Sequence, residues 1–446
     1  MGINKKLCAI FLAISILFSL TACTPQPEKK IGSGKEITMF VATDIHYMSK
    51  SLNDFGEAFA AFASSGDGKQ INYIEELVDA FAYDIKKKQP DILIISGDLT
   101  SNGEKINHQE LAGKLQQIEK SGTLVYVIPG NHDIQNPWAR GFKGNQQYLT
   151  PSIKSAEFAS IYGKFGYEEA ISRDTDSLSY LAAPSEDLWL LMLDTNQYEY
   201  NDLMGMPVTN GSIKEKTLEW IKECSQLAQE NHAELITVMH HNLMDHSGVL
   251  SEGYTLDNSQ EARKVFRDSG LTLTLSGHIH LQDIGTDDSS PIKLYDITTS
   301  ALSIYPQQYG VLKYSPKQGL DYSVAEVNVE GWAKNGGIKD ENLLKFETYS
   351  KDYFAKATYN KSYSGLQKQE GYTETERQQM AATMSLLNTH YFGGSIDAVR
   401  EEAMNSPGYK LLEKSTQGFH SKYMSSIIAD SYRNKRELHI PIGEVK

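Results

Sequence analysis

An α/β fold followed by a helical C-terminal domain is the fold class that the sequence predicts. Short apolar runs with the length of strands alternate with amphipathic helical segments as far as about residue 275 of the 446. Three more strand-like runs, joined by short loops, reach residue 329, and helical spacing prevails beyond residue 340. Strands separated by helices are typical of an α/β architecture in which helices cover the sheets. The three later runs are expected to form an antiparallel edge.

The helix expected at 74–85 illustrates the pattern. Its apolar side chains recur at helical spacing, which predicts one buried face. These side chains are Ile74, Leu77, Val78, Phe81 and Ile85. The runs expected to be strands are 37–42, 92–95, 124–128, 188–193, 235–239 and 271–275, followed by 292–297, 310–314 and 322–329 at the antiparallel edge.

The region from Asp340 onward is expected to be mostly helical. Thr373 and Glu376 have the spacing of a capping box and begin a helix there. One apolar face follows, made of Met380, Met384, Leu387 and Tyr391. Further helices are expected at 398–404 and 423–432.

The first 22 residues have the composition of a secretory signal peptide. Lys5 and Lys6 form a positive n-region, and residues 7–20 form an apolar h-region that is short for a transmembrane helix. The tetrapeptide Leu-Thr-Ala-Cys that ends at Cys23 resembles a bacterial lipobox, whose cysteine becomes the lipidated first residue. The alternative is an ordinary signal peptide with a cysteine near its cleavage site. We expect a chain outside the cytoplasm, anchored to the membrane by lipid on Cys23. The expected division is signal peptide 1–22, tether 23–35, α/β domain 36–335 and helical domain 336–446.

The three cysteines argue against a protein held by disulfides, and the net charge of −14 argues against one that binds nucleic acid or anionic lipid through its overall charge. Cys8 leaves with the signal peptide and Cys23 is expected to carry lipid, so Cys224 has no disulfide partner. We expect Cys224 to be a small buried hydrophobic residue in a helix. A chain this acidic binds long nucleic acid and anionic lipid poorly. Any phosphate that the protein handles therefore needs a local cation, and metal ions are the obvious supply.

Five of the expected strands end directly on residues that bind metal ions. In open α/β sheets ligands bind outside the carboxyl ends of strands, so these five ends should converge on one site. Each motif alone fits a turn, a cap or a buried histidine as well, but the five together favour a single metal centre. The candidate ligands are Asp44, His46, Asp98, Asn131, His240, His278 and His280, with His132, Asp133 and His241 beside them.

The mixture of donor types indicates which ions such a site would bind. Carboxylate and amide oxygens combined with imidazoles suit Mn, Fe or Zn, whereas an all-oxygen set would suit Ca or Mg. One carboxylate shared between two ions can hold them about 3.5–4 Å apart, as in two-metal hydrolases. A histidine beside such ions is suited to protonating a leaving oxygen. We therefore expect a hydrolase with two divalent or trivalent metal ions.

The order of motifs resembles that of the calcineurin-like metallophosphoesterase superfamily, over about residues 36–330. The shared motifs are Asp-x-His, Gly-Asp, Gly-Asn-His-Asp, a lone His and Gly-His-x-His. The resemblance implies an α-β-β-α sandwich of two sheets. It implies one metal held by Asp44, His46, Asp98 and His280, with Asp98 as the bridge, and a second completed by Asn131, His240 and His278.

The same resemblance assigns roles to the residues beside the ligands. It implies that His132, next to Asn131, contacts the substrate phosphate and helps the leaving group, and that Asp133 orients His132. His241 is left open at this point. It either contacts substrate, supports the ligands from behind, or is turned away by the alternation of side chains along its strand.

Two departures from a sister group narrow the function. Purple acid phosphatases carry a tyrosine where this chain has Ser101, and they lack a histidine at the position of His46. Asp98-Leu99-Thr100, with Gly103 downstream, resembles class III cyclic-nucleotide phosphodiesterases and related bacterial lipoproteins outside the cytoplasm. The resemblance implies phosphodiester hydrolysis, with 3′,5′- or 2′,3′-cyclic nucleotides as small substrates.

Other functions stay open on the sequence alone. One is a phosphomonoesterase or cell-surface nucleotidase that uses the same site. Another is a surface binding protein without enzymatic activity, in which the metal site is structural. A nuclease is disfavoured by the negative charge, and a lipid-linked diphosphate hydrolase would need an apolar groove. The sequence does not indicate an oligomeric state.

A group of aromatic residues lies between Asp340 and Thr373. These rings either stack on a nucleobase beside the metals or build the core and the seam between the domains. The loops expected at 53–69 and 138–148 are candidates for the pocket wall. The aromatic residues are Tyr349, Tyr353, Phe354, Tyr359, Tyr363 and Tyr372.

Overall fold

The computed structural model describes residues 30–415 and 418–441 of the chain. The predicted signal peptide and Cys23 lie outside the described residues. Within the described part, no helix has the length and apolar character needed to cross a bilayer.

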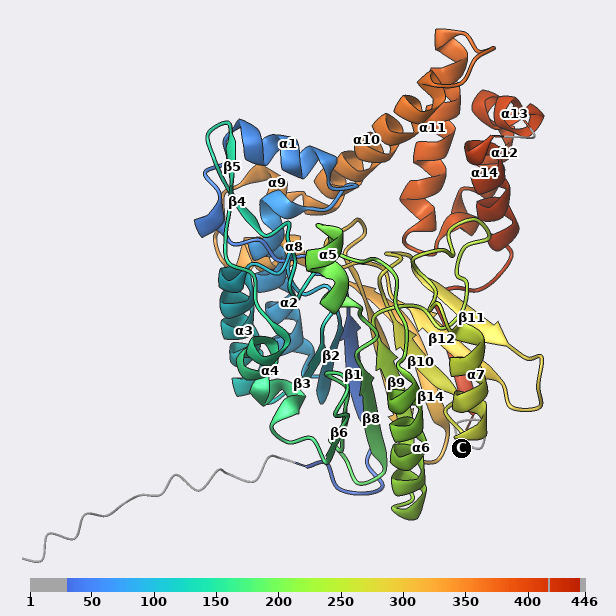
Figure 1. Ribbon diagram of the computed structural model, residues 1–446. Coiled ribbons are helices and arrows are strands. Elements are labelled where there is room, and N and C mark those ends of the chain that lie inside the picture. The colour runs from blue at the N-terminus through green and yellow to red at the C-terminus, as the bar shows by residue number, and fades with distance from the viewer. Residues whose placement is uncertain (1–29, 416–417, 442–446) are drawn as a thin grey trace, which may run out of the picture.

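Two mixed sheets packed face to face form the body of the protein (Figure 1). The first contains β1 (Ile37–Ala42), β2 (Ile92–Ser96), β3 (Leu124–Ile128), β13 (Gln308–Ser315), β14 (Gly319–Glu326) and β15 (Leu438–Pro441). The second contains β6 (Ser172–Arg173), β7 (Tyr180–Ala182), β8 (Leu188–Leu193), β9 (Glu234–Met239), β10 (Leu273–Ser276), β11 (Asp283–Asp287) and β12 (Leu294–Thr298). Each of the nine predicted strands overlaps one of these.

The first sheet has a parallel half and an antiparallel half, and the second has a parallel centre with antiparallel strands at both edges. The first sheet has the order β15-β14-β13-β1-β2-β3, in which β1, β2 and β3 are parallel. The second has the order β11-β12-β10-β9-β8-β7-β6, in which β12, β10, β9 and β8 are parallel. Because parallel strands run in the same direction, the carboxyl ends within each parallel set lie at the same edge of the sheet. The expected antiparallel edge of three strands is only partly right. β13 and β14 pair antiparallel, from Gln308 to Ser315 on β13, but the run expected at 292–297 is β12, which lies in the second sheet parallel to β10.

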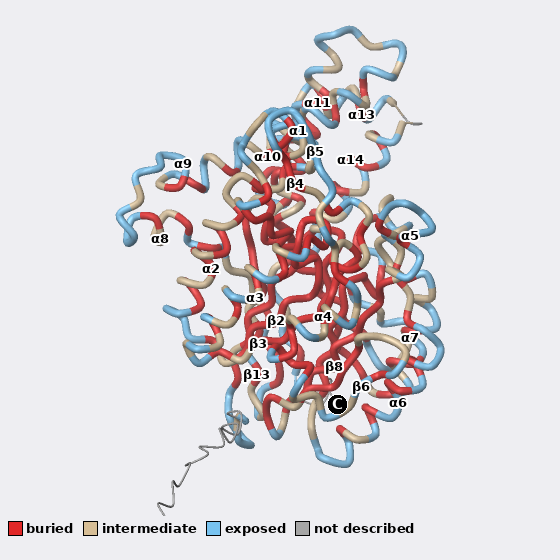
Figure 2. Tube along the Cα trace, turned by 60° about the vertical axis from the view of Figure 1, so that its left-hand side comes forward, coloured by how far each residue is buried: buried red, intermediate tan, exposed pale blue. Residues whose placement is uncertain are grey.

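Helices cover the outer faces of both sheets. α2 (Ile74–Lys88) and α3 (Lys105–Lys120) lie on the first sheet, and α6 (Glu215–Glu230) and α7 (Ser259–Asp268) lie on the second (Figure 1). The five apolar side chains predicted for α2 are all buried. Cys224 is buried in α6, as expected. Buried residues run through the strands of both sheets (Figure 2), and the predicted α-β-β-α sandwich is confirmed.

The C-terminal region is helical as predicted and has a core of its own. Thr373 and Glu376 form the expected capping box, in which each side chain bonds to the other residue's backbone N–H. The predicted face of Met380, Met384, Leu387 and Tyr391 is fully buried. The helices are α8 (Val329–Asn335), α9 (Glu341–Leu344), α10 (Phe346–Gln367), α11 (Glu374–Tyr391), α12 (Arg400–Asn405), α13 (Pro407–Lys414) and α14 (Phe419–Asp430).

The structure differs from the sequence expectations at three further places. In the stretch 138–148, where a loop was expected, β4 (Arg140–Lys143) pairs with β5 (Gln146–Leu149) as a hairpin. A strand follows the last described helix: β15 pairs antiparallel with β14 and completes the edge of the first sheet. This strand is too short to give a periodic signal. Residues 53–69 hold the helix α1 (Glu57–Ser65) where a loop was expected. Its alanines favour a helix, and the buried Phe59 fixes it to the core.

α10 is fixed to the segment around α1 by direct contacts. Tyr353 donates a hydrogen bond to the Ala63 carbonyl at 3.1 Å, and Lys361 pairs with Asp67 at 2.7 Å. These contacts hold the C-terminal helices over the carboxyl ends of the parallel strands (Figure 1).

A buried network of charges joins the second sheet to the residues after α14. The His246 ring lies between Asp283 at 2.8 Å and Asp296 at 3.0 Å. Arg433 reaches Asp283 at 3.2 Å from the other side. Burial opposes a charge on the ring, but Asp296 and Asp283 outweigh it and raise the pKa of His246 to about 9. His246 is therefore an imidazolium held between two carboxylates.

Replacing His246 with leucine should destabilise the fold by about 3–5 kcal/mol, because it leaves buried carboxylates without their cation. Denaturant unfolding at pH 7 measures this loss. The folded pKa of about 9 lies above the ordinary 6.5, so this contribution is complete below pH 6.5 and is lost as the pH rises towards 9. His246→Leu should lack that loss, and His439→Leu, which removes an exposed pair, should cost about 1 kcal/mol or less. Parallel stability profiles of wild type and His246→Leu over this range would contradict the prediction.

Candidate metal centre

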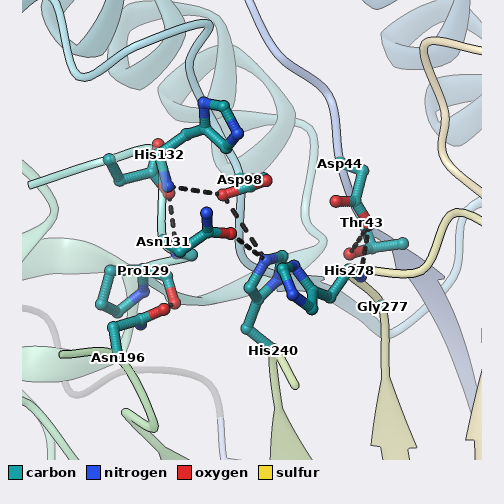
Figure 3. A network of polar contacts seen from close by, with 12 residues as sticks. Thr43, Asp44, Asp98, Pro129, Asn131, His132, Asn196, His240, Gly277 and His278 are labelled. Carbon is teal, nitrogen blue, oxygen red and sulfur yellow. Dashed lines mark hydrogen bonds and ion pairs between the residues drawn. The ribbon is translucent and has the colours of Figure 1, made fainter. Parts of the chain in front are cut away.

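The seven predicted ligands meet at the carboxyl ends of the parallel strands. Asp44 and His46 follow β1, Asp98 follows β2, and Asn131 follows β3. His240 follows β9, and His278 and His280 follow β10. Figure 3 shows five of them, Asp44, Asp98, Asn131, His240 and His278, turned towards one region. Their donor atoms form two overlapping groups, each within 4.8 Å, which are Asp44, His46, Asp98 and His280, and Asp98, His240 and His278.

In the first group, imidazole nitrogens and carboxylate oxygens point at one another. His46 Nε2 lies 3.3 Å from His280 Nε2 and 3.6 Å from Asp98 Oδ2. Asp44 Oδ1 lies 3.3 Å from His280 Nε2, and this oxygen is buried without a hydrogen-bond partner in the described part of the chain. The other oxygen, Oδ2, accepts hydrogen bonds from the Thr43 hydroxyl and the His278 N–H. Asp44 therefore keeps one oxygen available to coordinate a metal ion.

In the second group, backbone carbonyls set the tautomers of the histidines. His240 Nδ1 lies 2.9 Å from the Ser96 carbonyl, which can only accept, so Nδ1 donates and the Nε2 lone pair faces the site. His278 Nε2 donates to the Gly253 carbonyl at 2.7 Å in the same way, which leaves Nδ1 as the ring nitrogen with a lone pair. His240 Nε2 lies 3.2 Å from Asn131 Oδ1. The predicted ligand Asn131 therefore stands with this group.

Asp98 is common to the two groups. Its Oδ1 lies 3.5 Å from His240 Nε2, and its Oδ2 lies 3.6 Å from His46 Nε2. Oδ1 also accepts the backbone N–H of His132 at 2.9 Å, which fixes the plane of the carboxylate. The two oxygens thus face different groups, as a shared ligand requires.

Five of the ligand residues have left-handed backbone conformations. Such a conformation costs roughly 1–3 kcal/mol per residue, and it clusters at functional sites. The neighbouring strand ends hold it in place: Asp44 N–H donates to the Gly97 carbonyl, and His46 N–H donates to the Asp98 carbonyl. The five φ values are 53° at Asp44, 49° at His46, 48° at Asp98, 68° at His278 and 63° at His280.

Glycines next to the ligands allow the loops to approach this closely. A Cβ at Gly130 would lie 2.2 Å from the backbone nitrogen of Asp98, and one at Gly277 would lie 2.0 Å from the Thr43 hydroxyl. Both positions therefore need glycine. The Gly-Asn and Gly-His motifs of the sequence reflect this packing as well as the ligands.

The donor set fits two metal ions. It combines carboxylate oxygens, an amide oxygen and imidazole nitrogens, with one carboxylate common to both groups. Burial disfavours a charge on His240, but Asp98 and Asp44 outweigh it and raise its pKa to about 9. The buried carboxylates thus attract positive charge to the position where a bound cation would supply it.

His132 stands at the rim of the site, half-buried where most of the ligands are buried. Its Nδ1 donates to the Ser101 carbonyl at 3.0 Å and lies 3.1 Å from Asn102 Oδ1. The predicted orienting residue, Asp133, is not among these partners. Its carboxylate accepts hydrogen bonds from the backbone of Leu99, Thr100 and Gly130 and from the Thr100 hydroxyl. Asp133 therefore fixes the two ligand loops to each other, and Ser101 and Asn102 orient His132.

His241 is turned away from the substrate side of the site, so the substrate contact that the sequence left open for it is wrong. Its Nε2 donates to the Thr209 carbonyl at 3.0 Å, and its Nδ1 lies 2.8 Å from the Thr195 hydroxyl. The ring is buried 4.4 Å from the His278 ring. Alternation along β9 explains this, since His240 and His241 follow one another and point to opposite sides. His241 supports His278 from behind.

Sequence reasoning missed three residues that act on the site. Thr43 and Asn102 hold Asp44 and His132 through side-chain hydrogen bonds; Asn102 precedes Gly103 in a tight loop, which is the one signal for it. Lys69 brings a positive charge near the ligands. Burial lowers its pKa, and the charges of Asp67, Asp98 and Asp44 oppose that shift. No local motif marks Lys69, because only the fold brings it to the site.

Two family models match the sequence. The model of the calcineurin-like phosphoesterases matches residues 37–282, which is more than half of the chain and includes every ligand of both groups. The model of the C-terminal domain of cyclic nucleotide phosphodiesterase matches residues 328–434. No curated protein matches the chain.

The chain also matches solved structures at low sequence identity. A dimetal phosphatase from Danio rerio is 11% identical with a TM-score of 0.45, over 65% of this chain and 95% of that chain. A Plasmodium protein described as the anchor in the inner membrane complex is 11% identical with a TM-score of 0.39, over 66% and 85%. A Staphylococcus aureus protein assigned as a 5′-nucleotidase is 12% identical with a TM-score of 0.40, over 66% and 54%.

Removing Asp98 should empty both halves of the centre, because its oxygens face both groups. Inductively coupled plasma mass spectrometry of dialysed protein should find about two ions per wild-type chain and less than one in Asp98→Ala. Asn131→Ala, which touches one group, should keep about one ion, and the exposed Asp257→Ala should match the wild type. Retention of both ions by Asp98→Ala would show that Asp98 is not the shared ligand.

Proposed function

The chain belongs to the calcineurin-like phosphoesterase family and is a metal-dependent phosphoesterase; from this premise we propose that it hydrolyses phosphodiesters, with 3′,5′- or 2′,3′-cyclic nucleotides as substrates. The observation that carries the substrate class is the second match, in which residues 328–434 resemble the C-terminal domain of cyclic nucleotide phosphodiesterase. That segment comprises α8 to α14, of which α10 and α11 lie beyond the carboxyl ends of the parallel strands (Figure 1).

Each group of ligands would hold one ion, and we propose Mn, Fe or Zn on the basis of the mixed oxygen and nitrogen donors. Asp44, His46, Asp98 and His280 would hold the first, and Asp98, Asn131, His240 and His278 the second. When bound, two such ions neutralise phosphate charge and lower the pKa of a coordinated water. The left-handed loops hold the donors in place before substrate arrives.

His132 and Asn131 are the groups that would act on the phosphate ester. Because Nδ1 of His132 is committed to the Ser101 carbonyl, Nε2 is the nitrogen that exchanges a proton with the leaving oxygen. Asn131 Nδ2 is buried and has no acceptor within the described residues. It is thus available to donate a hydrogen bond to a phosphate oxygen, which would orient the ester beside His132.

We also propose that the protein works outside the cytoplasm, anchored through lipid on Cys23. The support is the signal-like composition and the lipobox-like tetrapeptide. Ile31, at the start of the described chain, pairs with Ser185 just before β8, at the edge of the sandwich opposite the metal ligands. An anchor ahead of this point would leave the metal centre facing away from the membrane.

The substrate class is tested with a panel of esters and added Mn²⁺. The panel contains 2′,3′-cyclic AMP, 3′,5′-cyclic AMP and bis(4-nitrophenyl) phosphate, together with the monoesters 5′-AMP and 4-nitrophenyl phosphate. We expect kcat/KM for the diesters to exceed that for the monoesters. Turnover of monoesters alone would contradict the phosphodiesterase assignment and support a phosphomonoesterase.

His132→Ala should lower kcat for cyclic nucleotides by about 10²–10⁴-fold, because their alkoxide leaving group needs a proton. The loss should be smaller for bis(4-nitrophenyl) phosphate, whose leaving group is a stable anion. Metal content and the unfolding midpoint should stay close to wild type, and the exposed His439→Ala serves as the control. Equal losses on both substrates would rule out proton transfer by His132, and loss of metal would make it a structural residue.

A further inference from the structure

A cavity of about 250 Å³ adjoins the metal centre and plays no part in the roles assigned above. One wall consists of residues 278–281 and Tyr254, and the opposite wall belongs to α10, α11 and α14. His278 and His280 line the cavity and also contribute to the two ligand groups. A phosphate held at the metals therefore has its ester substituent next to this cavity.

The walls of the cavity are mostly apolar and carry several rings. Leu281, Met384 and Phe392 contribute apolar surface. The Tyr254 ring lies 5.3 Å from the His278 ring, and the Phe419 and Tyr423 rings stack with centroids 5.7 Å apart. None of the six aromatic residues noted between Asp340 and Thr373 belongs to this wall. The aromatic surface beside the metals comes instead from α14 and the loop that holds Tyr254.

Thr358, Ser362 and His420 also line the helical wall, but among these polar residues of the described chain only Asn388 has a buried polar atom without a partner. The residue is 7% exposed, and its Oδ1 is buried without a hydrogen-bond partner in the described part of the chain. A buried amide that lacks a partner is costly unless a ligand completes it. At the mouth, Lys361 pairs with Asp67 at 2.7 Å, so its charge is already balanced.

These features define the chemistry of a group that would fit the cavity. Ligand cavities of this kind, typically about 300–1,000 Å³, combine apolar walls with a few placed polar groups. A flat ring with apolar faces and hydrogen-bonding edges satisfies both the walls and Asn388, and a carboxamide can pair with such an edge at two atoms. An acyl chain would leave the amide unpaired. A second phosphate would meet an apolar wall and a lysine that is already paired.

We propose that this cavity is a nucleobase subsite, in which Asn388 reads the edge of the base while the phosphate lies at the metal centre. The proposal rests on the phosphodiesterase function above and adds the part of the substrate that the helical region selects. It makes Asn388 a specificity residue, separate from the residues that act on phosphate.

The test measures a nucleoside that has no phosphate, so that it does not depend on catalysis. Adenosine is titrated by isothermal calorimetry into wild type, Asn388→Leu and Ala357→Trp. Asn388→Leu keeps the branching of the side chain at Cγ but replaces the amide with a larger apolar group, and Ala357→Trp fills the cavity from α10 without removing a buried group. Asn405→Leu, on the exposed face of α12, is the matched control.

We expect both cavity variants to weaken adenosine binding by about tenfold or more, as the loss of a buried hydrogen-bonded contact implies, and Asn405→Leu to bind like wild type. The ratio of kcat/KM for 2′,3′-cyclic AMP to kcat/KM for bis(4-nitrophenyl) phosphate should fall by a similar factor. Unfolding midpoints report whether each variant is folded.

The possible results separate the subsite from the proposed function. If wild type hydrolyses cyclic nucleotides but adenosine does not bind, or binds all variants alike, the subsite is wrong and the function stands. If only bis(4-nitrophenyl) phosphate is hydrolysed but adenosine binding depends on the cavity, the subsite stands and the proposed substrate is wrong. An equal loss of activity on both esters would assign Asn388 a structural role and overturn the proposal.

Discussion

The carboxylate of Asp98 faces two ligand groups at once, and its position depends on how the two sheets pack. The first group takes Asp44, His46 and Asp98 from the first sheet and His280 from the second. The second group also takes donors from both, since Asn131 follows β3 and His240 and His278 follow strands of the other sheet. Neither group can form within one sheet. The core between the sheets, where the fully buried Leu190, Ile236 and Val238 of the second sheet belong to the same cluster as the first sheet, therefore sets the distances between donors, and the geometry of the site follows from the packing of the sandwich.

The centre concentrates several features that each oppose folding. Five ligand residues have left-handed backbones, buried carboxylates face one another, and Asp44 Oδ1 has no hydrogen-bond partner among the described residues. At roughly 1–3 kcal/mol for each strained residue, the backbone alone approaches the stability of a typical domain. Only a rigid surrounding structure keeps such loops in place, which is why they stand at the ends of central strands. A cation shared by these donors would offset part of the cost, so metal binding and folding stability are coupled in this chain.

The sequence predicted the central strands and the convergence of the seven candidate ligands because both depend on local patterns. Buried strands give uninterrupted apolar runs, and Gly-Asp, Gly-Asn-His and Gly-His-x-His each mark a loop where packing requires glycine next to a ligand. The orientation of His132 was not predictable, because a backbone carbonyl of Ser101 supplies it and any residue has one. His241 was ambiguous because the direction of a side chain depends on the pleat of β9. The strand β15 and the position of Asn388 depend on contacts between segments far apart in the chain. The division into domains and the lipid anchor stay predictions.

The arrangement separates chemistry from recognition. Every metal ligand lies within residues 37–282, which match the phosphoesterase family, whereas the wall with Asn388 lies in the segment that matches a cyclic nucleotide phosphodiesterase domain. Metal donors recognise a phosphate in any ester and cannot distinguish one ester from another. Discrimination must therefore come from the group that contacts the rest of the substrate. Because the ion pair of Asp67 and Lys361 and the hydrogen bond from Tyr353 tie α10 to the catalytic domain, that wall is held at a fixed distance from the metals. A substituent that is too large or lacks a hydrogen-bonding edge would then hold its phosphate away from His132. Under the proposal, the fit of the base in the cavity would thus decide which phosphate esters are hydrolysed.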